Sequence, residues 1–403
     1  MSREPLRQPL GPAFDRLLTA TAVTNLGDGI RLATLPLLAT TLTDSPVAIA
    51  GVTAAQFLPW LVFAPVGGLI VDRADRRGLI LHTQAWRAAV MAALAAVVLA
   101  DVAAMWMLFV VAFVITVGEI LVDPSVVAIV PSIVDRADLD RANGRISSVE
   151  IVTNEVIGAP MGAGLFIAAP WVPFIVDGLS YLTSTLPFRR LPPTPRPSTA
   201  KAGLSDAISE IPAGLRWLLR HPMLRPWTLA VAVFNLGAAA GFSLLVLLVF
   251  DTHDGTELSY AVVLTAAAVV AAAASTVAAR LVEHHGRARV LLSGSAIAAL
   301  TLIALGTTKG LVLAGALWSI NGAATAVNMA IGRGFIQRYC PDEILGRAAI
   351  ASRTITRTAF VIGALAGGAI AAGTTIQTTF TVAGIVQLAA LAPMATAFRQ
   401  DHA

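Results

Sequence analysis

Ionisable side chains are rare inside the long apolar stretches of this sequence, and those that occur are the best candidates for chemistry. They are Asp28 with Arg31 three residues on, Glu119 with Asp123 four residues on, Glu155 beside Asn154, and Arg353 with Arg357. A charged group at the centre of a bilayer costs at least about 2.5 kcal/mol, so such residues usually face partners or water. Burial of a carboxyl group favours its protonated form. These carboxyl groups could therefore bind and release a proton, or pair with the arginines.

The composition requires that lipid surrounds most of the chain. Of the 403 residues, 56% are hydrophobic and only 13% are charged, and the mean hydropathy is +0.77. A membrane-spanning helix needs roughly 20 mostly apolar residues, and polar breaks divide the sequence into twelve such stretches. We predict an all-α membrane protein with spans near 17–40, 47–71, 79–100, 104–128, 147–168, 171–188, 225–250, 258–282, 288–307, 310–332, 350–373 and 377–397.

The basic residues predict the orientation of these spans. Lys and Arg in short loops remain on the cytoplasmic side, and they concentrate in the even-numbered connections, whereas only Lys309 lies in an odd-numbered one. We therefore expect a multi-pass protein of the plasma (inner) membrane with both termini in the cytoplasm. Because the basic residues are dispersed over several loops, the net charge of +4 indicates contact with the lipid bilayer and no nucleic-acid partner.

The widest interruption, residues 189–224, divides the chain almost in half. It begins with a proline-rich stretch typical of an extended linker, and residues 204–220 have the amphipathic pattern of a helix at the inner membrane surface. The two halves repeat each other weakly, since residues 157–164 match 362–368. We predict an N-terminal six-helix bundle over 1–188, a cytoplasmic linker with an amphipathic helix over 189–224, and a C-terminal six-helix bundle over 225–403.

A charged loop separates the second and third predicted spans. It reads Gly68-Leu69-Ile70-Val71-Asp72-Arg73-Ala74-Asp75-Arg76-Arg77. This sequence resembles the Gly-x-x-x-Asp-Arg-x-Gly-Arg-Arg loop of the major facilitator superfamily, with Asp75 where many members have glycine. Together with Asn25-Leu26-Gly27-Asp28-Gly29-Ile30 and Leu58-Pro59, it is similar to the drug:proton antiporter branch that contains macrolide-efflux and enterobactin-exporter-like proteins.

The resemblance implies a fold of two pseudo-symmetric six-helix bundles and a conformational latch in this loop. The latch residues are Gly68, Asp72, Arg73, Arg76 and Arg77. Asp72 would meet the inner end of the eleventh span, and Arg76 would meet an acid near the fourth span. A carboxylate is favoured beside a helix amino terminus, and arginine binds carboxylates in a bidentate fashion. Alternatively, these arginines serve only to anchor the topology.

Close helix packing is expected in the fifth and eleventh spans. Gly158 precedes Ala159-Pro160-Met161-Gly162-Ala163-Gly164, which resembles the Gly-Pro-x-x-Gly-Gly type of motif in drug antiporters of this superfamily. Small residues let helix backbones approach in lipid, and proline can kink a helix. We assign the packing role to Gly158, Pro160, Gly162 and Gly164, together with Arg353 and Arg357 of the eleventh span. Packing without any bearing on antiport is the alternative.

The resemblance also implies that the first, fourth, seventh and tenth spans line a central cavity. This would place Asp28, Glu119 and Asp123 where cargo could compete with a proton, and Glu155 in the fifth span is a further proton-coupling candidate. We expect Asp28 to carry the proton. Alternatively, Asp28 is permanently paired with Arg31 or with an arginine of the eleventh span. Glu119 is the next candidate for the proton carrier, and Asp123, toward the inner end of its span, is a candidate for the acid that faces Arg76. Asp177 falls close to the predicted lipid boundary, and we assign it no role.

Polar and aromatic side chains complete the expected cavity. We assign to it Asn25, Arg31, Asn235, Asn321, Asn328 and Trp318. A mostly apolar pocket with a few polar groups suits an amphipathic organic molecule. For Trp318, packing between helices is favoured over contact with cargo.

The sequence offers no means of hydrolysing ATP. Its only lysines are Lys201 and Lys309, and neither follows glycine as a phosphate-binding loop requires. The adjacent His284 and His285 cannot share one helix face, and the single Cys340 excludes a disulfide framework. We therefore expect no cofactor, no metal and no enzymatic activity.

These features predict a monomeric secondary transporter. We expect it to export an amphipathic small molecule, such as an antibiotic, a drug or a siderophore-like metabolite, in exchange for protons by alternating access. A lysophospholipid or other metabolite transporter or importer of the same fold is an alternative. A membrane scaffold or sensor that does not transport is another.

Overall fold

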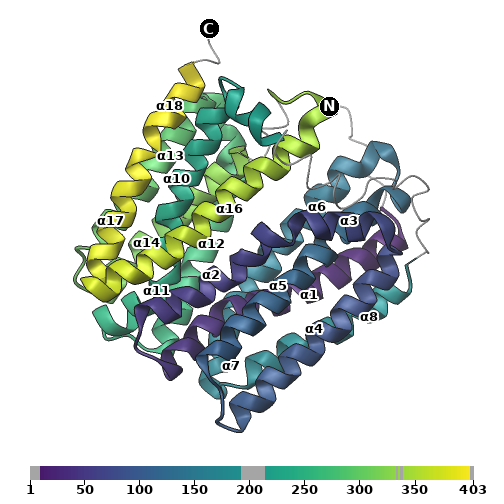
Figure 1. The fold of residues 1–403 in the computed structure, drawn as a ribbon, viewed down its shortest axis with the longest axis horizontal. Helices are drawn as coiled ribbons and strands as arrows, with labels where there is room; N and C mark the ends of the chain where they lie inside the picture. The colour runs from purple at the N-terminus through teal and green to yellow at the C-terminus, as the bar shows by residue number, and fades with distance from the viewer. Residues whose placement is uncertain (1–9, 192–213, 333–334, 336–338, 400–403) are drawn as a thin grey trace, which may run out of the picture.

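The computed structural model describes residues 10–191, 214–332, 335 and 339–399, and all secondary structure within them is helical (Figure 1). Before the linker the helices are α1 (Pro12–Leu42), α2 (Pro46–Val62), α3 (Ala64–Arg73), α4 (Arg76–Leu99), α5 (Met105–Ile129), η1 (Val130–Ser132), η2 (Arg136–Asp138), α6 (Leu139–Ile151), η3 (Val152–Gly158), α7 (Ala159–Ala168) and α8 (Val172–Arg189). After it they are α10 (Leu224–Ser243), α11 (Leu245–Leu247), η4 (Leu248–Thr252), α12 (Glu257–His285), α13 (Arg287–Leu305), α14 (Leu311–Gly332), α16 (Asp342–Gly373), α17 (Ile376–Ala389) and α18 (Leu391–Arg399).

Length and composition identify many of these helices as membrane spans. Among the described residues, 9 helical stretches are long and apolar enough to cross a membrane, and α2 is a shorter apolar helix. The predicted class, an all-helical membrane protein, is therefore confirmed. The prediction of twelve spans goes beyond this count and stays a prediction.

Proline shapes the fifth predicted span, which is built from α6, η3 and α7. Pro160 has no N–H, and its ring would clash with the carbonyl group one α-helical turn earlier. The segment directly before it, η3, is π-helical, and the Ala159 N–H donates to the carbonyl group of Asn154, five residues back. A π-helical turn is a known way to accommodate such a disruption without ending the helix.

Glycines allow two equivalent pairs of helices to approach closely. A Cβ atom at Gly158 would lie 2.8 Å from the carbonyl oxygen of Leu26 in α1, and one at Gly363 would lie 2.8 Å from Cα of Leu236 in α10. The glycines occupy matching positions in the weak internal repeat of the sequence. The repeat therefore reflects the same close packing in each half.

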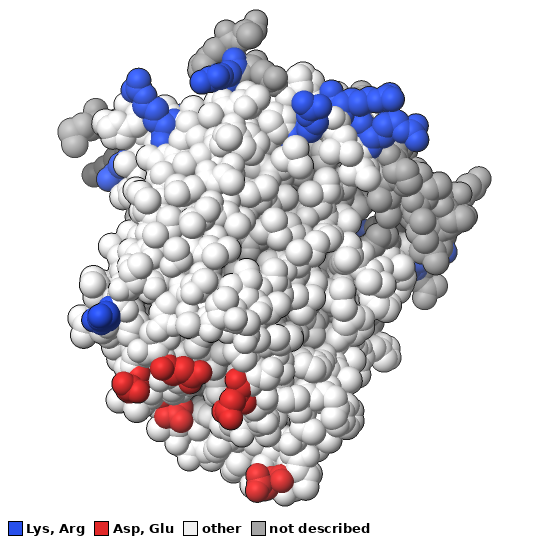
Figure 2. Space-filling view, turned by 60° about the vertical axis from the view of Figure 1, so that its left-hand side comes forward, with Lys and Arg blue, Asp and Glu red and all other residues white. Residues whose placement is uncertain are grey.

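Charged residues are separated between the two ends of the molecule. Figure 2 shows Lys and Arg side chains mainly at one end of this face, Asp and Glu side chains near the other, and a broad uncharged belt between them. One basic side chain lies nearer the acidic end. An uncharged belt of this kind is what a membrane-embedded surface requires.

Among the described residues, buried apolar clusters join the two halves of the chain toward one end and also where α2 meets α10 and α16. One cluster contains Leu35 and Ile49 from the first half together with Leu245 and Tyr260 from the second. These residues lie toward the acidic end, where α2 also packs beside α16 (Figure 1). Toward the basic end, a cluster around Phe14 and Ile129 contains only first-half residues, and a separate cluster around Trp227, Phe335 and Phe398 contains only second-half residues.

The predicted linker is described only at its edges. Residues 214–220 are helical, whereas the proline-rich stretch and residues 204–213 of the predicted amphipathic helix lie outside the described residues. Lys201 lies outside them too. Asp72 belongs to α3, but its side chain is not described.

Candidate functional site

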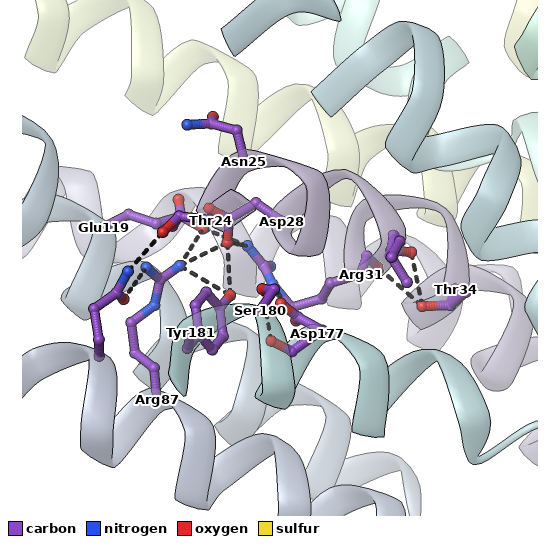
Figure 3. Close-up of polar contacts among 12 residues, drawn as sticks. Thr24, Asn25, Asp28, Arg31, Thr34, Arg87, Glu119, Asp177, Ser180 and Tyr181 are labelled. Atoms are coloured by element: carbon purple, nitrogen blue, oxygen red, sulfur yellow. Dashed lines mark hydrogen bonds and ion pairs between the residues drawn. The ribbon is translucent and has the colours of Figure 1, made fainter. Parts of the chain in front are cut away.

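A buried cluster of charged side chains lies among α1, α4, α5 and α8 (Figure 3). It contains Asp28 and Arg31 of α1, Arg87 of α4, Glu119 of α5 and Asp177 of α8, and we call it the ion cluster. Four of its side chains are 0–11% exposed, and that of Glu119 is 21% exposed. Charged residues this far from water are tolerated only when they are paired.

Asp28 is held by three donors. Its Oδ1 atom lies 2.6 Å from Nη2 of Arg87, 2.6 Å from the hydroxyl group of Tyr181 and 3.3 Å from Nη2 of Arg31. The Arg87 guanidinium also donates to the Tyr181 hydroxyl at 3.0 Å and stacks 4.0 Å from the centre of its ring. Asp28 is therefore the most strongly hydrogen-bonded carboxylate of the ion cluster.

Glu119 and Asp177 lie on either side of Arg31. Glu119 pairs closely with Nη2 of Arg31 and lies 3.6 Å from Nη2 of Arg87. Asp177 is fully buried, and its Oδ2 atom lies 3.8 Å from Nε of Arg31. Neither carboxylate oxygen of Asp177 accepts a hydrogen bond from the part of the chain that the structure describes.

Uncharged side chains fix the position of Arg87. Its Nη1 atom donates to Oε1 of Gln84 at 3.1 Å, and the Gln84 amide donates to Thr24 at 2.7 Å and to Ser184 at 3.1 Å. Gly118 of α5 leaves room for the arginine, because a Cβ atom there would lie 2.6 Å from Cδ of Arg87. The guanidinium therefore has little freedom to leave Asp28.

The ion cluster contains one more acidic group than basic groups. It contains three carboxyl groups and two guanidinium groups, and arginine stays protonated in proteins. With every carboxyl group ionised, the cluster would carry one uncompensated negative charge in a buried site, which is costly. A single bound proton would make it neutral, so the arrangement is suited to taking up and releasing one proton.

The structure brings three of the predicted site residues together, namely Asp28, Arg31 and Glu119. Asp123 lies one turn further along α5 with an exposed side chain, and Glu155 lies in η3, also exposed. Asn25 donates to the carbonyl group of Thr21 in its own helix and points away from the ion cluster in Figure 3.

The other predicted cavity residues contact neighbouring helices. Asn235 of α10 donates to the carbonyl group of Thr356 in α16 at 3.2 Å. In α14, Asn321 donates to the carbonyl group of Ala298 at 2.8 Å, and Asn328 donates to Ser295 at 2.9 Å, both in α13. Trp318 packs against the core cluster that joins the two halves. Hydrogen bonds of this type hold membrane helices together.

The predicted packing residues behave differently from one another. Gly162 faces α1, since a Cβ atom there would lie 2.8 Å from Cα of Ile30, whereas a Cβ atom at Gly164 would meet nothing within 4 Å. Arg357 of α16 lies over the rings of Phe57 and Trp60 in α2, 5.1 and 5.4 Å from their centres. Such cation–π contacts are attractive. Arg353 has an exposed side chain.

The charged loop between α3 and α4 contacts the first half of the chain. Arg76 donates to the carbonyl group of Ala128 near the carboxyl end of α5 at 2.9 Å, a position where the helix dipole favours a cation. Arg77 donates to the carbonyl group of Leu191 at 3.0 Å. Asp75 caps α4 by accepting a hydrogen bond from the Gly78 N–H at 3.0 Å. Capping explains why a carboxylate is accommodated where many superfamily members have glycine.

An apolar pocket of about 390 Å³ lies between α10 and α16. Its lining consists of Leu215, Ala232, Leu236, Ala351, Thr354, Ile355, Thr358, Ala359 and Ile362. The hydroxyl groups of Thr354 and Thr358 donate to backbone carbonyl groups of their own helix, so the pocket offers an incoming molecule a largely apolar surface.

Comparison with known proteins identifies the family. Residues 2–401 match the MFS_3 family, described as transmembrane secretion effectors. This chain belongs to the MFS_3 family. It is accordingly a membrane transporter of the major facilitator type and not an enzyme.

Relatives of this MFS_3 chain are distant. An uncharacterised MFS-type transporter, YfiS of Bacillus subtilis (strain 168), is 25% identical over 382 residues, which are 91% of this chain and 89% of the relative. Macrolide efflux protein A of Streptococcus pyogenes is 27% identical over 111 residues, which are 28% of this chain and 27% of the relative.

Solved structures share the fold of the MFS_3 chain. The nucleoside transporter NupG (D323A mutant) has a TM-score of 0.79 at 13% identity, with coverage of 95% of this chain and 99% of that one. A bacterial homologue of the iron transporter ferroportin has a TM-score of 0.70 at 18% identity, with coverage of 97% and 99%. At these identities the likeness supports the fold alone.

Several residues of the site of this MFS_3 chain were not predicted from the sequence. Arg87 lies in the middle of the predicted span 79–100, so the rule that selected Asp28 applied to it equally. Asp177 was set aside because of its predicted place near the lipid boundary. Gln84 and Tyr181 carry no charge and gave no comparable signal.

Proposed function

We propose that this MFS_3 chain exports an amphipathic small molecule in exchange for protons. The ion cluster carries the proposal, because one uncompensated carboxyl group among two arginines is suited to reversible proton binding inside a membrane protein. Among the predicted proton-coupling residues, Asp28 and Glu119 belong to the cluster. Asp123 and Glu155, with exposed side chains, are proposed to assist at its edge.

The proposed architecture has twelve spans in two six-helix bundles, 1–188 and 225–403, joined by the linker 189–224. Consecutive shorter helices support this count when each run is taken as one span: α2 with α3, α6 with η3 and α7, α10 with α11 and η4, and α17 with α18. The close packing of α7 on α1 and of α16 on α10 supports an internal repeat.

The proposed location is the plasma (inner) membrane, with both termini in the cytoplasm. The separation of basic and acidic side chains in Figure 2 supports this orientation, because loops rich in Lys and Arg remain on the cytoplasmic side. We propose that the protein works as a monomer.

Alternating access is proposed from the distribution of the apolar core. The two halves share core clusters toward the acidic end and where α2 meets α10 and α16, and they have separate clusters toward the basic end. This distribution of core clusters is expected for a transporter that is closed on the extracellular side and open on the cytoplasmic side. In the opposite state, the loop residues Gly68, Asp72, Arg73, Arg76 and Arg77 are proposed to latch the inner face. The contacts of Arg76 and Arg77 within the first half support this, because both arginines donate to carbonyl groups of that half in this state.

The proposed cargo has a sizeable apolar part. The pocket between α10 and α16 supports this, together with the scarcity of exposed polar groups in it. Asn25, Arg31, Asn235, Asn321, Asn328 and Trp318 are proposed to line the route of the cargo. Export is proposed because a segment of the chain is similar to macrolide efflux protein A.

The proposal is tested by flux in vesicles. The purified protein is reconstituted in sealed liposomes with a pH gradient, and the movement of a macrolide and of a lipophilic cationic dye is followed. We expect flux that depends on the gradient and is abolished by an uncoupler. Asp28→Asn should abolish the gradient-dependent flux, because the cluster then needs no proton to be neutral. The control variant Asp101→Asn, in the exposed turn after α4, should retain this flux.

Cells that carry the protein should accumulate less macrolide than cells without it, and an uncoupler should remove the difference. Greater accumulation in cells that carry the protein would indicate an importer. Absence of gradient-driven flux for every cargo tested, with no effect of Asp28→Asn, would refute proton-coupled export and favour a scaffold or sensor.

A further inference from the structure

Asp177 is the least compensated member of the ion cluster. Its side chain is fully buried, and its nearest cationic atom, Nε of Arg31, lies 3.8 Å away. Neither of its carboxylate oxygens accepts a hydrogen bond from the described residues. A buried carboxylate in this situation retains the full cost of leaving water.

The other two carboxyl groups of the cluster are well supplied with donors. Asp28 accepts hydrogen bonds from Arg87, Tyr181 and Arg31. Glu119 pairs with Arg31 and lies near Arg87. Protonation of either would replace strong charge-assisted hydrogen bonds with weaker ones. A proton on Asp177 would sacrifice no such bond.

The polar side chains near Asp177 donate their hydrogen bonds to other acceptors. The Ser180 hydroxyl donates to the backbone carbonyl group of Asp177 at 2.7 Å. Tyr181 has one hydroxyl proton, which it donates to Asp28. On the α1 side the neighbour is Gly27, where a Cβ atom would lie 3.0 Å from Cβ of Ser180. The charged groups that face Asp177 are thus those of the ion cluster itself.

We propose that the exchangeable proton of the ion cluster binds to Asp177, and that Arg31 is the positioning residue that transmits its loss to Glu119. With the proton bound, the cluster is neutral and Arg31 remains paired with Glu119. When the O–H bond of Asp177 breaks, the proton passes to water that reaches the cluster at the partly exposed Glu119. The new negative charge attracts Arg31, whose Nε atom already points toward Asp177.

The movement of Arg31 from Glu119 toward Asp177 indicates a class of cargo. As Arg31 moves toward Asp177, its contact with Glu119 weakens, and the Glu119 carboxylate becomes available to a cationic group. The transported molecule would therefore carry a positive charge beside its apolar part. This role in coupling rests on the proposed proton-driven export, whereas the place of protonation does not.

Infrared difference spectroscopy of the purified protein tests the place of protonation without any transport. The carbonyl stretching band of a protonated buried carboxyl group is followed as pH is raised from acidic to alkaline. The wild-type band should shift when aspartate carries ¹³C in its carboxyl group, and should not shift with labelled glutamate. Asp177→Asn should lose the band. Asp101→Asn should retain it, since Asp101 is exposed and its positive φ of 56° tolerates asparagine.

A band that shifts with labelled glutamate, or that persists in Asp177→Asn, would overturn the assignment. If the variant does not fold, the labelled wild-type protein still tests whether an aspartate or a glutamate carries the proton. Binding of a lipophilic cationic dye tests the part played by Arg31: wild-type affinity should rise with pH, and Asp177→Asn should bind with a weak affinity that pH does not change. Dye binding that keeps its pH dependence in this variant would overturn the link to Glu119. Failure of gradient-driven flux with an intact infrared result would refute only the proposed function.

Discussion

Replacing Arg87 with methionine tests the charge balance of the ion cluster directly. The Arg87 guanidinium is fully buried, 2.6 Å from Asp28 and 3.0 Å from the Tyr181 hydroxyl. Methionine fills a comparable space, so Arg87→Met removes the charge with little change in packing. Three carboxyl groups would then face the single guanidinium of Arg31. Removal of one partner from a buried ion pair costs about 3–5 kcal/mol, which is the expected loss in the free energy of unfolding.

A second substitution in the same chain should recover part of this loss. Asp28→Asn combined with Arg87→Met leaves two carboxyl groups and one guanidinium, which restores the net charge of the original cluster. The asparagine oxygen can still accept a hydrogen bond from Tyr181. We therefore expect the two substitutions to be less damaging together than the sum of their separate effects, by about 0.5–3 kcal/mol.

Unfolding of the purified protein by SDS in mixed micelles, followed by tryptophan fluorescence, measures these differences. Arg136→Met is the matched control, because Arg136 is exposed at the basic end and its loss should change the free energy of unfolding by no more than about 0.5 kcal/mol. Wild-type stability in Arg87→Met, or strict additivity in the double variant, would refute the charge-balance argument.

Two further predictions concern packing and pH. Gly162→Ala should lower the free energy of unfolding by about 1–3 kcal/mol, because its Cβ atom would lie 2.8 Å from Cα of Ile30. Gly164→Ala, which meets nothing within 4 Å, should be nearly neutral in the same unfolding assay, and equal losses would contradict the packing assignment. Burial lowers the pKa of His253, whose Nδ1 atom accepts a hydrogen bond from the Gly310 N–H and must therefore be unprotonated. Since the unfolded chain binds more protons at this site, stability should fall as pH drops below about 6.5. His253→Gln should reduce this slope in unfolding curves recorded across pH, and an unchanged slope would assign the effect to other groups.

The sequence was sufficient for the features that depend on local pattern. Apolar runs and their polar breaks identified the membrane class and most helix positions, because the thickness of the bilayer sets the length of a span. The spacing of Asp28 and Arg31 placed both on one helix face, and the structure pairs them at 3.3 Å. Transporter family membership followed from the loop after the second span, and the family comparison confirms it.

Partners from distant segments could not be predicted from spacing. Asp28 is bound by Arg87, 59 residues away, and by Tyr181, 153 residues away. Their approach depends on how α4 and α8 pack against α1, which no local pattern specifies. The π-helical segment before Pro160 shows the same limit, because proline predicts a disruption without predicting how the backbone accommodates it.

The sequence of α1 links this packing to the proposed chemistry. Gly27 and Gly29 flank Asp28, and their missing side chains let α8 and η3 approach the helix at the level of the carboxylate: a Cβ atom at Gly29 would lie 2.8 Å from Cα of Asn154. The glycines therefore bring Asp177 and Tyr181 within reach of Asp28 and Arg31, and the contacts of Tyr181 with Asp28 and of Asp177 with Arg31 then connect α8 to α1.

The ion cluster is assembled entirely from helices of the first half, so a proton bound there must influence the second half through a side chain at its edge. Glu119 is the partly exposed member of the cluster, and Arg357 of α16 lies close enough for electrostatic interaction with it. Arg357 also contacts the rings of Phe57 and Trp60 in α2, which belong to the other half. A change in the charge available on Glu119 would therefore alter the strength of the attachment between α16 and the first half. This is one physical connection between proton binding and the movement of one half against the other.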